Sequence, residues 1–433
     1  MAWLGGGDRS GEGGGGGALA RLFRRTRPAY HRNGMQLDQE HGSPPFAPPR
    51  RILVVKLFAL GDMLNITPAL RALRARYPEA RIDVLATRGG AVGLHRSPFV
   101  DDVFLFDKSL FDSVGGSLSP RALLVGLRFA FDLRRRRYDT LVLLHHLVTG
   151  WGTVKYMALA LWSGATTRVG LDNGRGWFLT HRVRDRGFGA IDERRYWLAV
   201  VAALDAHSDD DRPHFAVTEA DQDEGARLLA AVPGDGPIVA IHPTNGAYAA
   251  GRAWPPERFA AVADRLAREW GARIVLVGTE TAAIGQVAAL MATPSLDLSG
   301  RTDLPTLAGT LGHVALLLGN DSSVAHLAAA LGVPVLALFG PSNDRAWAPW
   351  GTTRVVLPPA EAQLPALPAS QGIVVRSAAP QAPCLYSGFG PGNPDGCPRC
   401  DCLALIDAGR VARLAGALLA RDGYRPRSTS PVA

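Results

Sequence analysis

The chain has 433 residues, 47% of them hydrophobic and 20% charged, which excludes an intrinsically disordered protein and is long enough for two domains. Its net charge is +8, and lysine occurs only at positions 56, 108 and 155, so arginine supplies nearly all of the positive charge. Arginine binds phosphate and carboxylate through two hydrogen bonds at once, so the composition favours acidic ligands.

The N-terminal residues 1–50 are rich in glycine, arginine and proline and lack apolar periodicity, which predicts a flexible tail. They lack the apolar core and cleavage site of a secretory signal. The most apolar stretch, Leu141–Trp162, is interrupted by polar residues and glycines, so it does not match a membrane span. We therefore expect a cytoplasmic protein.

From residue 51 onward, apolar runs typical of buried parallel strands alternate with segments typical of helices. This alternation predicts a first Rossmann-like domain over residues 51–206. Its predicted strands are Ile52–Val55, Ile82–Ala86, Val103–Phe106 and Thr140–Leu144, and its predicted helices are Met63–Tyr77, Pro120–Arg135, Val154–Trp162 and Arg194–Leu204.

A polar stretch over residues 207–236, with a short helix at Asp221–Ala231, is the predicted interdomain region. The alternation then restarts and predicts a second Rossmann-like domain over residues 237–357. Two such domains in succession predict an α/β protein with a ligand cleft between them. The predicted strands of the second domain are Ile238–Ile241, Ile274–Val277, Val314–Leu318 and Val333–Phe339, and its helices are Pro256–Trp270, Thr279–Leu290 and Ser322–Leu331.

The C-terminal part divides into a Pro/Gly/Cys-rich segment, 358–402, and a terminal helix with a polar tail, 403–433. The segment contains every cysteine of the chain. Their spacing is unlike the usual pairs of zinc ligands, because three of them fall within six residues. Unbridged thiols or a redox-labile cluster are equally compatible, and we predict no metal site. The cysteines are Cys384, Cys397, Cys400 and Cys402.

Polar residues follow several of the predicted strands, at the sheet edge where α/β proteins bind ligands. Asp62 lies between the first strand and its helix, where it could act in the cleft or merely cap the helix. Asn320, Asp321, Ser322 and Ser323 begin a later helix, whose free N–H groups and positive dipole end form an anion site. His326 falls on the same helix face as Ser323. The alternative there is an ordinary cap with a core histidine.

Two further strand ends carry candidate ligand-binding residues. Thr244 and Asn245 lie in the loop after Ile241, and Arg252 precedes the next helix, where it could reach a diphosphate or remain a solvated loop charge. Glu280 follows the next strand, where a carboxylate could hold ribose hydroxyls or act as a first-turn helix charge.

The order of these motifs resembles the heptosyltransferase family of glycosyltransferases, which has the GT-B fold. The resemblance covers about residues 51–351. It rests on V-K-x-x-x-x-G-D from Val55 to Asp62, the H-P stretch with R-x-W-P from His242 to Pro255, D-L-S-G-R-T over Asp297–Thr302, G-N-D-S-S-V-A-H-L-A-A-A-L-G-V-P over Gly319–Pro334, and F-G-P-S over Phe339–Ser342.

The resemblance implies an inverting, metal-independent glycosyltransferase that moves a sugar, with heptose as one candidate, from a nucleotide-diphosphate donor to a lipopolysaccharide or other surface-glycan acceptor. It assigns Asp62 as the general base, Arg252 to the donor phosphates and Glu280 to the donor ribose. It assigns binding of the donor diphosphate and sugar to the loop that contains Asp321, Ser322, Ser323 and His326. No cofactor is implied.

Two alternatives to this function stay open: a sugar-nucleotide epimerase of similar architecture and a non-catalytic nucleotide- or glycan-binding protein. A nucleic-acid partner is not expected, because the chain lacks a recognisable nucleic-acid-binding module. The Arg134–Arg137 run is either a solvated helix end or a contact with anionic lipid or glycan at the inner membrane.

Overall fold

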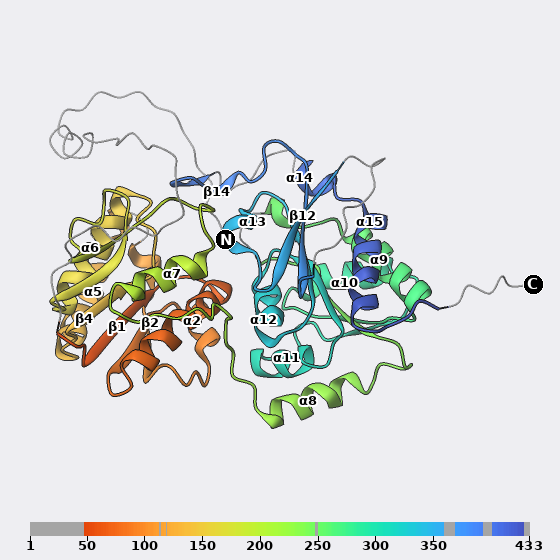
Figure 1. Cartoon of the computed structure of the whole chain (residues 1–433), viewed down its shortest axis with the longest axis horizontal. Coiled ribbons are helices and arrows are strands. Elements are labelled where there is room, and N and C mark those ends of the chain that lie inside the picture. Colours follow the sequence, from red (N-terminus) through yellow and green to blue (C-terminus); the bar gives the residue numbers. More distant parts are fainter. Residues whose placement is uncertain are drawn as a thin grey trace, which may run out of the picture.

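The computed structural model describes residues 47–111, 114–117, 119–246, 250–358, 369–392 and 401–427. Two α/β domains lie next to each other, each built on its own parallel sheet, which confirms the predicted pair of Rossmann-like domains (Figure 1). The predicted tail over residues 1–50 falls almost entirely outside the described residues.

The N-terminal sheet has six strands in the order β3-β2-β1-β4-β5-β6, the order found in Rossmann folds. Each pair of neighbouring strands in this sheet is parallel. Its strands are β1 (Arg51–Lys56), β2 (Arg81–Ala86), β3 (Asp102–Leu105), β4 (Thr140–Leu143), β5 (Thr167–Asp172) and β6 (His181–Arg184). Its helices are α2 (Leu60–Arg76), α3 (Arg88–Ala91), α4 (Val114–Ser117), α5 (Pro120–Arg135), α6 (Gly150–Ser163) and α7 (Glu193–Ala202).

The C-terminal sheet has seven strands in the order β12-β13-β11-β10-β7-β8-β9, again parallel throughout. Its strands are β7 (Ile238–His242), β8 (Arg273–Leu276), β9 (Ser295–Asp297), β10 (Leu316–Asn320), β11 (Val335–Phe339), β12 (Thr352–Leu357) and β13 (Gly372–Ser377). Its helices are α9 (Pro256–Trp270), α10 (Thr281–Leu290), α11 (Leu304–Leu311), α12 (Ser323–Leu331), α13 (Asp344–Trp347), α14 (Asp401–Ala404) and α15 (Ala408–Arg421).

Both sheets reverse their strand order at the same relative place, between β1 and β4 in one and between β7 and β10 in the other. In open α/β sheets, ligands bind beyond the carboxyl ends of the strands at such a point. The loops that follow these four strands are therefore the expected site-forming segments of each domain.

An interior strand of the sheet lies where the sequence indicated only an irregular Pro/Gly/Cys-rich segment. β13 pairs with β11 on one side and β12 on the other, so it is an interior strand of the C-terminal sheet. Its apolar residues Ile373, Val374 and Val375 are fully buried. The run was missed because it is short and lies between proline-, alanine- and glycine-rich stretches that do not suggest a core strand.

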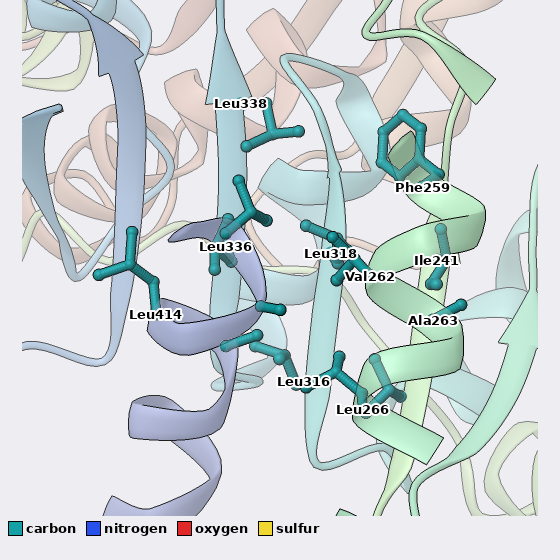
Figure 2. Close-up of a cluster of buried hydrophobic side chains, with 14 of the residues drawn as sticks. Ile241, Phe259, Val262, Ala263, Leu266, Leu316, Leu318, Leu336, Leu338 and Leu414 are labelled. Atoms are coloured by element: carbon teal, nitrogen blue, oxygen red, sulfur yellow. The ribbon is translucent and has the colours of Figure 1, made fainter. Parts of the chain in front are cut away.

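One core layer of the C-terminal domain lies between the sheet and two helices distant in sequence, α9 and α15 (Figure 2). Val262 and Leu266 of α9 and Leu414 of α15 pack over Leu316, Leu318 and Leu336 of the sheet. Gly416 lets the two helices approach, because a Cβ there would lie 2.8 Å from the Trp270 indole. The terminal helix is thus part of the C-terminal domain.

The predicted interdomain region contains α8 (Glu219–Leu229), which crosses below the C-terminal domain in Figure 1. It packs closely on α11 through Gly225 and Gly309, where added Cβ atoms would meet the facing backbone at 2.3 Å and 1.8 Å. Helix α8 therefore packs on the C-terminal domain, whereas the segment before it contacts α2 of the N-terminal domain, where Arg71 donates to the Asp210 carbonyl at 2.8 Å.

Candidate active site

A cavity of about 900 Å³ lies between the two domains, at the carboxyl ends of both sheets. It is lined from the N-terminal domain by Lys56, Asp62, His146 and Glu193, and from the C-terminal domain by most of the residues that the sequence singled out. These are Asn245, Arg252, Glu280, Asp321, Ser322, Ser323 and His326. The tertiary structure therefore brings Asp62 together with the predicted anion-binding loop.

Asp62 is the third residue of α2, and the helix is preceded by Ala59, which provides no side-chain cap. The alternative that Asp62 serves as the helix cap is thus wrong. Burial raises the pKa of Asp62, and the ammonium of Lys56 and a hydrogen bond with Trp347 oppose that rise. A carboxylate with a raised pKa is a stronger base than one in water.

Lys56, the last residue of β1, is buried beneath Asp62, with 3.8 Å between its Nζ and the carboxylate. Its ammonium also lies 4.2 Å from the centre of the Trp197 ring. Carboxylate and aromatic face together replace the water that a buried ammonium loses. Lys56 belongs to the V-K-x-x-x-x-G-D motif, but the sequence did not assign it a role.

The N-terminal ends of α2 and α12 face each other across the cleft. The Gly61 N–H donates to Ser323 Oγ at 3.2 Å. A Cβ at position 61 would lie 3.0 Å from His326 Cδ2, a spacing that side chains rarely adopt. The glycine before Asp62 therefore permits the close approach that places the carboxylate opposite the start of α12.

Several buried polar atoms of the cavity wall lack a hydrogen-bond partner within the described part of the chain. They include Ser322 Oγ, Asn245 Nδ2 and His326 Nδ1. Ser322 precedes α12 without capping it. Burial, with smaller effects of Arg194 and Arg252, lowers the pKa of His326 to about 4, so its ring is neutral near pH 7. Unpartnered buried polar atoms are rare in proteins, and a group of them around one cavity indicates a polar ligand.

Arg252 reaches the same loop from the other side. Its guanidinium donates to the Asp321 carboxylate at 2.6 Å and to the Asp321 carbonyl at 2.8 Å, and its side chain is only 15% exposed. The alternative of a solvated loop charge is therefore wrong. The predicted loop residues 247–249 next to it lie outside the described residues.

Glu280 precedes α10 without capping it through its side chain. Its Oε2 accepts hydrogen bonds from Thr244 at 2.8 Å and Thr279 at 3.2 Å. Burial would raise the pKa of Glu280, but these hydroxyl groups hold it below its usual value. Thr244 does not line the cavity directly, so in this structure it positions Glu280.

Asn320 also lies behind the cavity wall and is fully buried. Its Oδ1 accepts from the Trp254 N–H at 3.1 Å, and its Nδ2 donates to the Pro243 carbonyl at 2.6 Å. The prediction that Asn320 contacts substrate does not match this placement, because both ends of its amide are occupied by backbone. Asn320 instead ties the loop after β7 to the end of β10.

A second charged group on the N-terminal side was not predicted. His146, just beyond β4, lies between Asp185 and Glu193, with 3.0 Å from Nδ1 and Nε2 to the two carboxylates. Burial alone would lower the pKa of His146, but the two carboxylates raise it to about 9, so the ring is an imidazolium at pH 7. Asp62 was predicted because it is a polar residue that follows a strand, and the same criterion would have selected His146. Nothing in the sequence indicated a role for Asp185 or Glu193.

An aromatic cluster closes one end of the cavity. Phe188, Trp347 and Tyr386 have ring centres 5.2 to 5.4 Å apart, and all three line the cavity. Tyr386 belongs to the hairpin of β14 (Leu385–Ser387) and β15 (Gly390–Gly392). The Phe188 N–H donates to the Gly388 carbonyl at 2.7 Å, so the hairpin joins the two domains.

Among the described residues, no cluster of three or more His, Cys, Asp and Glu side chains is arranged to hold a metal ion. Cys384 and Cys402 are described, but Cys397 and Cys400 are not, so the hypotheses on the cysteine cluster stay predictions. Within the same described ranges, no helix is long and apolar enough to cross a membrane.

Comparison with known proteins agrees with this geometry. Residues 127–369 match the model of glycosyltransferase family 9 (heptosyltransferase), which is more than half of the chain. The chain belongs to glycosyltransferase family 9.

Among the relatives of this family 9 chain, lipopolysaccharide heptosyltransferase 3 of Escherichia coli (strain K12) is 26% identical over 306 residues, covering 67% of this chain and 82% of that protein. The solved ADP-heptose lps heptosyltransferase II of E. coli superposes with a TM-score of 0.61 at 23% identity, over 86% of this chain and 99% of that chain. E. coli heptosyltransferase WaaC with ADP superposes with a TM-score of 0.57 at 17% identity, over 85% and 99%.

Membership of this family shows that the protein is a glycosyltransferase. The superpositions show that its two-domain arrangement is the GT-B fold. The predicted family, fold and enzyme class are confirmed.

Proposed function

We propose that this glycosyltransferase transfers a sugar from a nucleotide-diphosphate donor to a lipopolysaccharide or related surface-glycan acceptor, with inversion and without a metal ion. One observation carries the proposal: a partly buried carboxylate of one domain and a group of unpartnered polar atoms of the other share a single cavity. The N-terminal domain, residues 51–206, would hold the acceptor, and the C-terminal domain, beginning at residue 237, the donor.

In the proposed reaction, the Asp62 carboxylate removes the proton of an acceptor hydroxyl as its oxygen attacks the anomeric carbon of the donor. The bond from that carbon to the diphosphate oxygen breaks on the opposite face, and its electron pair leaves with the diphosphate. Attack from the opposite face inverts the anomeric centre. The raised pKa of Asp62 supports this role, since a carboxylate with a higher pKa accepts a proton more readily.

The leaving diphosphate gains negative charge, which the start of α12 is suited to receive. The N–H groups of an uncapped helix end, the Ser322 hydroxyl and the Arg252 guanidinium converge on the cavity. Arg252 is already paired with Asp321, so its position is set before the donor binds. These groups would supply the stabilisation that a metal ion provides in other transferases.

The donor nucleotide is proposed to lie between this helix end and Glu280. The Glu280 carboxylate, held by Thr244, can accept hydrogen bonds from ribose hydroxyls. ADP, which the solved WaaC structure contains, is the first nucleotide to test, with an ADP-heptose as the first donor.

The test is a comparison of Asp62→Asn and Arg252→Ala with the parent enzyme. Thermal shift with ADP-, GDP-, UDP- and dTDP-sugars would first identify the donor, because a bound donor raises the melting temperature. Asp62→Asn should then lose transfer by at least about a hundredfold while keeping nucleotide affinity. Arg252→Ala should weaken ADP binding in calorimetry. Unchanged turnover in Asp62→Asn would remove this residue from the mechanism.

Product analysis with donor alone separates this proposal from the alternatives. An epimerase would convert the donor without any acceptor, and a binding protein would leave it unchanged even with acceptor present. Family membership supports the transferase over both alternatives.

A further inference from the structure

Helix α5 of the N-terminal domain turns an apolar stripe toward solvent. Leu123, Leu124, Leu127 and Phe131 are 51, 52, 68 and 62% exposed. The inner face of the same helix carries the buried Ala122, Gly126 and Leu133, with Phe129 partly buried against Phe104 and Phe106. A surface helix normally points its large apolar residues inward, so the additional outward stripe requires another explanation.

The exposed apolar residues form a continuous stripe, because positions 123, 127 and 131 recur every four residues and position 124 lies between them. Arg121, Arg128 and Arg135 are spaced seven apart and follow one flank of that stripe, and all three are exposed. The Arg135 guanidinium lies 5.5 Å from the Phe131 ring, so its charge is held beside the apolar surface. Asp132 is the only acidic residue of this helix.

The patch extends onto the neighbouring helix. Arg134 lies over Gly164, the residue that ends α6, since a Cβ at Gly164 would fall on the Arg134 guanidinium. Leu161 and Trp162, in the last turn of α6, are themselves 53 and 44% exposed. Figure 1 shows α5 and α6 on the outer side of the N-terminal domain, away from the C-terminal domain.

We propose that this surface of α5 and the end of α6 docks on an anionic phospholipid bilayer. Leucine and phenylalanine would enter the boundary between headgroups and acyl chains, and the flanking arginines would bind lipid phosphates. An apolar groove in another protein could bury the leucines, but it would not account for the row of arginines along one side of the stripe. This inference depends on the proposed function in one respect: a glycan acceptor held in the membrane would explain why the enzyme binds a bilayer.

The position of α5 in the N-terminal domain suits an enzyme whose acceptor is held in a membrane. The helix follows β3 and leads back to β4, so it runs from the carboxyl edge of the sheet, where the cavity lies, to the opposite edge. A bilayer against α5 would lie beside the domain that carries Asp62. A lipid-anchored acceptor could then reach the cavity without leaving the membrane.

The test is sedimentation of the full chain with vesicles of phosphatidylglycerol and phosphatidylcholine, compared with pure phosphatidylcholine. The parent protein should bind the anionic vesicles, and added salt should weaken binding. Leu127→Glu/Phe131→Glu should reduce binding at least about tenfold. Replacing Arg121, Arg128 and Arg135 by Gln should cost about fivefold for each arginine.

The matched control is Leu290→Glu/Leu405→Glu, which removes two similarly exposed leucines from the C-terminal domain. It should bind vesicles like the parent. A cooperative melting transition followed by circular dichroism checks that each variant is folded, and vesicle binding needs no turnover, so it can succeed or fail independently of the transferase proposal. No binding by the parent, or equal binding by the α5 variants, would overturn the inference. Self-association abolished by the α5 changes, without vesicle binding, would assign the face to a second copy instead.

Discussion

Replacing His146 by Gln tests whether the buried charge cluster stabilises the N-terminal domain. The pKa of His146 is raised from 6.5 to about 9 by Glu193 and Asp185, against the opposing effect of burial. At about 1.4 kcal/mol per pH unit, this difference corresponds to ~3 kcal/mol of stability from the charged ring. Gln keeps much of the volume and hydrogen-bonding capacity but removes the charge, leaving two buried carboxylates without a cation.

The pH dependence has a definite sign. Because the folded-state pKa is the higher one, the stabilisation is complete below about pH 6.5 and is lost as the pH rises through about 9. The difference in unfolding free energy between parent and His146→Gln should therefore be ~3 kcal/mol at about pH 6 and fall by half near about pH 8. Above about pH 9.5 little of the charge contribution should remain.

The assay is urea unfolding of both proteins at a series of pH values, followed by circular dichroism. His207→Gln serves as the control for the substitution itself, because that histidine is exposed and lies outside the buried charge cluster. A difference of the same size at both ends of the pH range would show that packing, not charge, is responsible. A difference below about 1 kcal/mol at pH 6 would refute the reasoning altogether.

Three further changes test the site. Because burial raises the pKa of Asp62, turnover should fall as the pH drops through a value above 3.8, and Asp62→Asn should remove that limb from the remaining activity. Gly61→Ala should change the melting temperature by only a few degrees, because the better helix propensity of alanine offsets its 3.0 Å contact with His326 Cδ2. The same change should reduce transfer about tenfold, because it pushes the starts of α2 and α12 apart. Full activity would show that these two helix ends need not meet. Thr244→Val should weaken nucleotide binding about three- to tenfold, measured by calorimetry, because Glu280 loses its hydrogen bond, and unchanged affinity would separate Glu280 from the nucleotide.

The sequence determined the elements whose pattern is local. Strands such as β1 and β7 are continuous apolar runs, and helices such as α9 have Pro at the start and a glycine in left-handed conformation at the end. Hydrophobic periodicity and capping residues act within a few positions along the chain, so they can be read without a tertiary structure. The motifs around Asp62 and Ser322 were found in the same way, as polar residues at strand ends.

Only the tertiary structure decided which of these residues meet. Gly61 and Ser323 are 262 positions apart, and their contact depends on how two separately formed sheets face each other. The partners of His146 and the interior position of β13 likewise depend on long-range packing. Local sequence carries no signal for such contacts, because burial and electrostatic pairing are properties of the folded surroundings. The sequence thus indicated which strand ends carry polar residues, and the tertiary structure brings those strand ends together around one cavity.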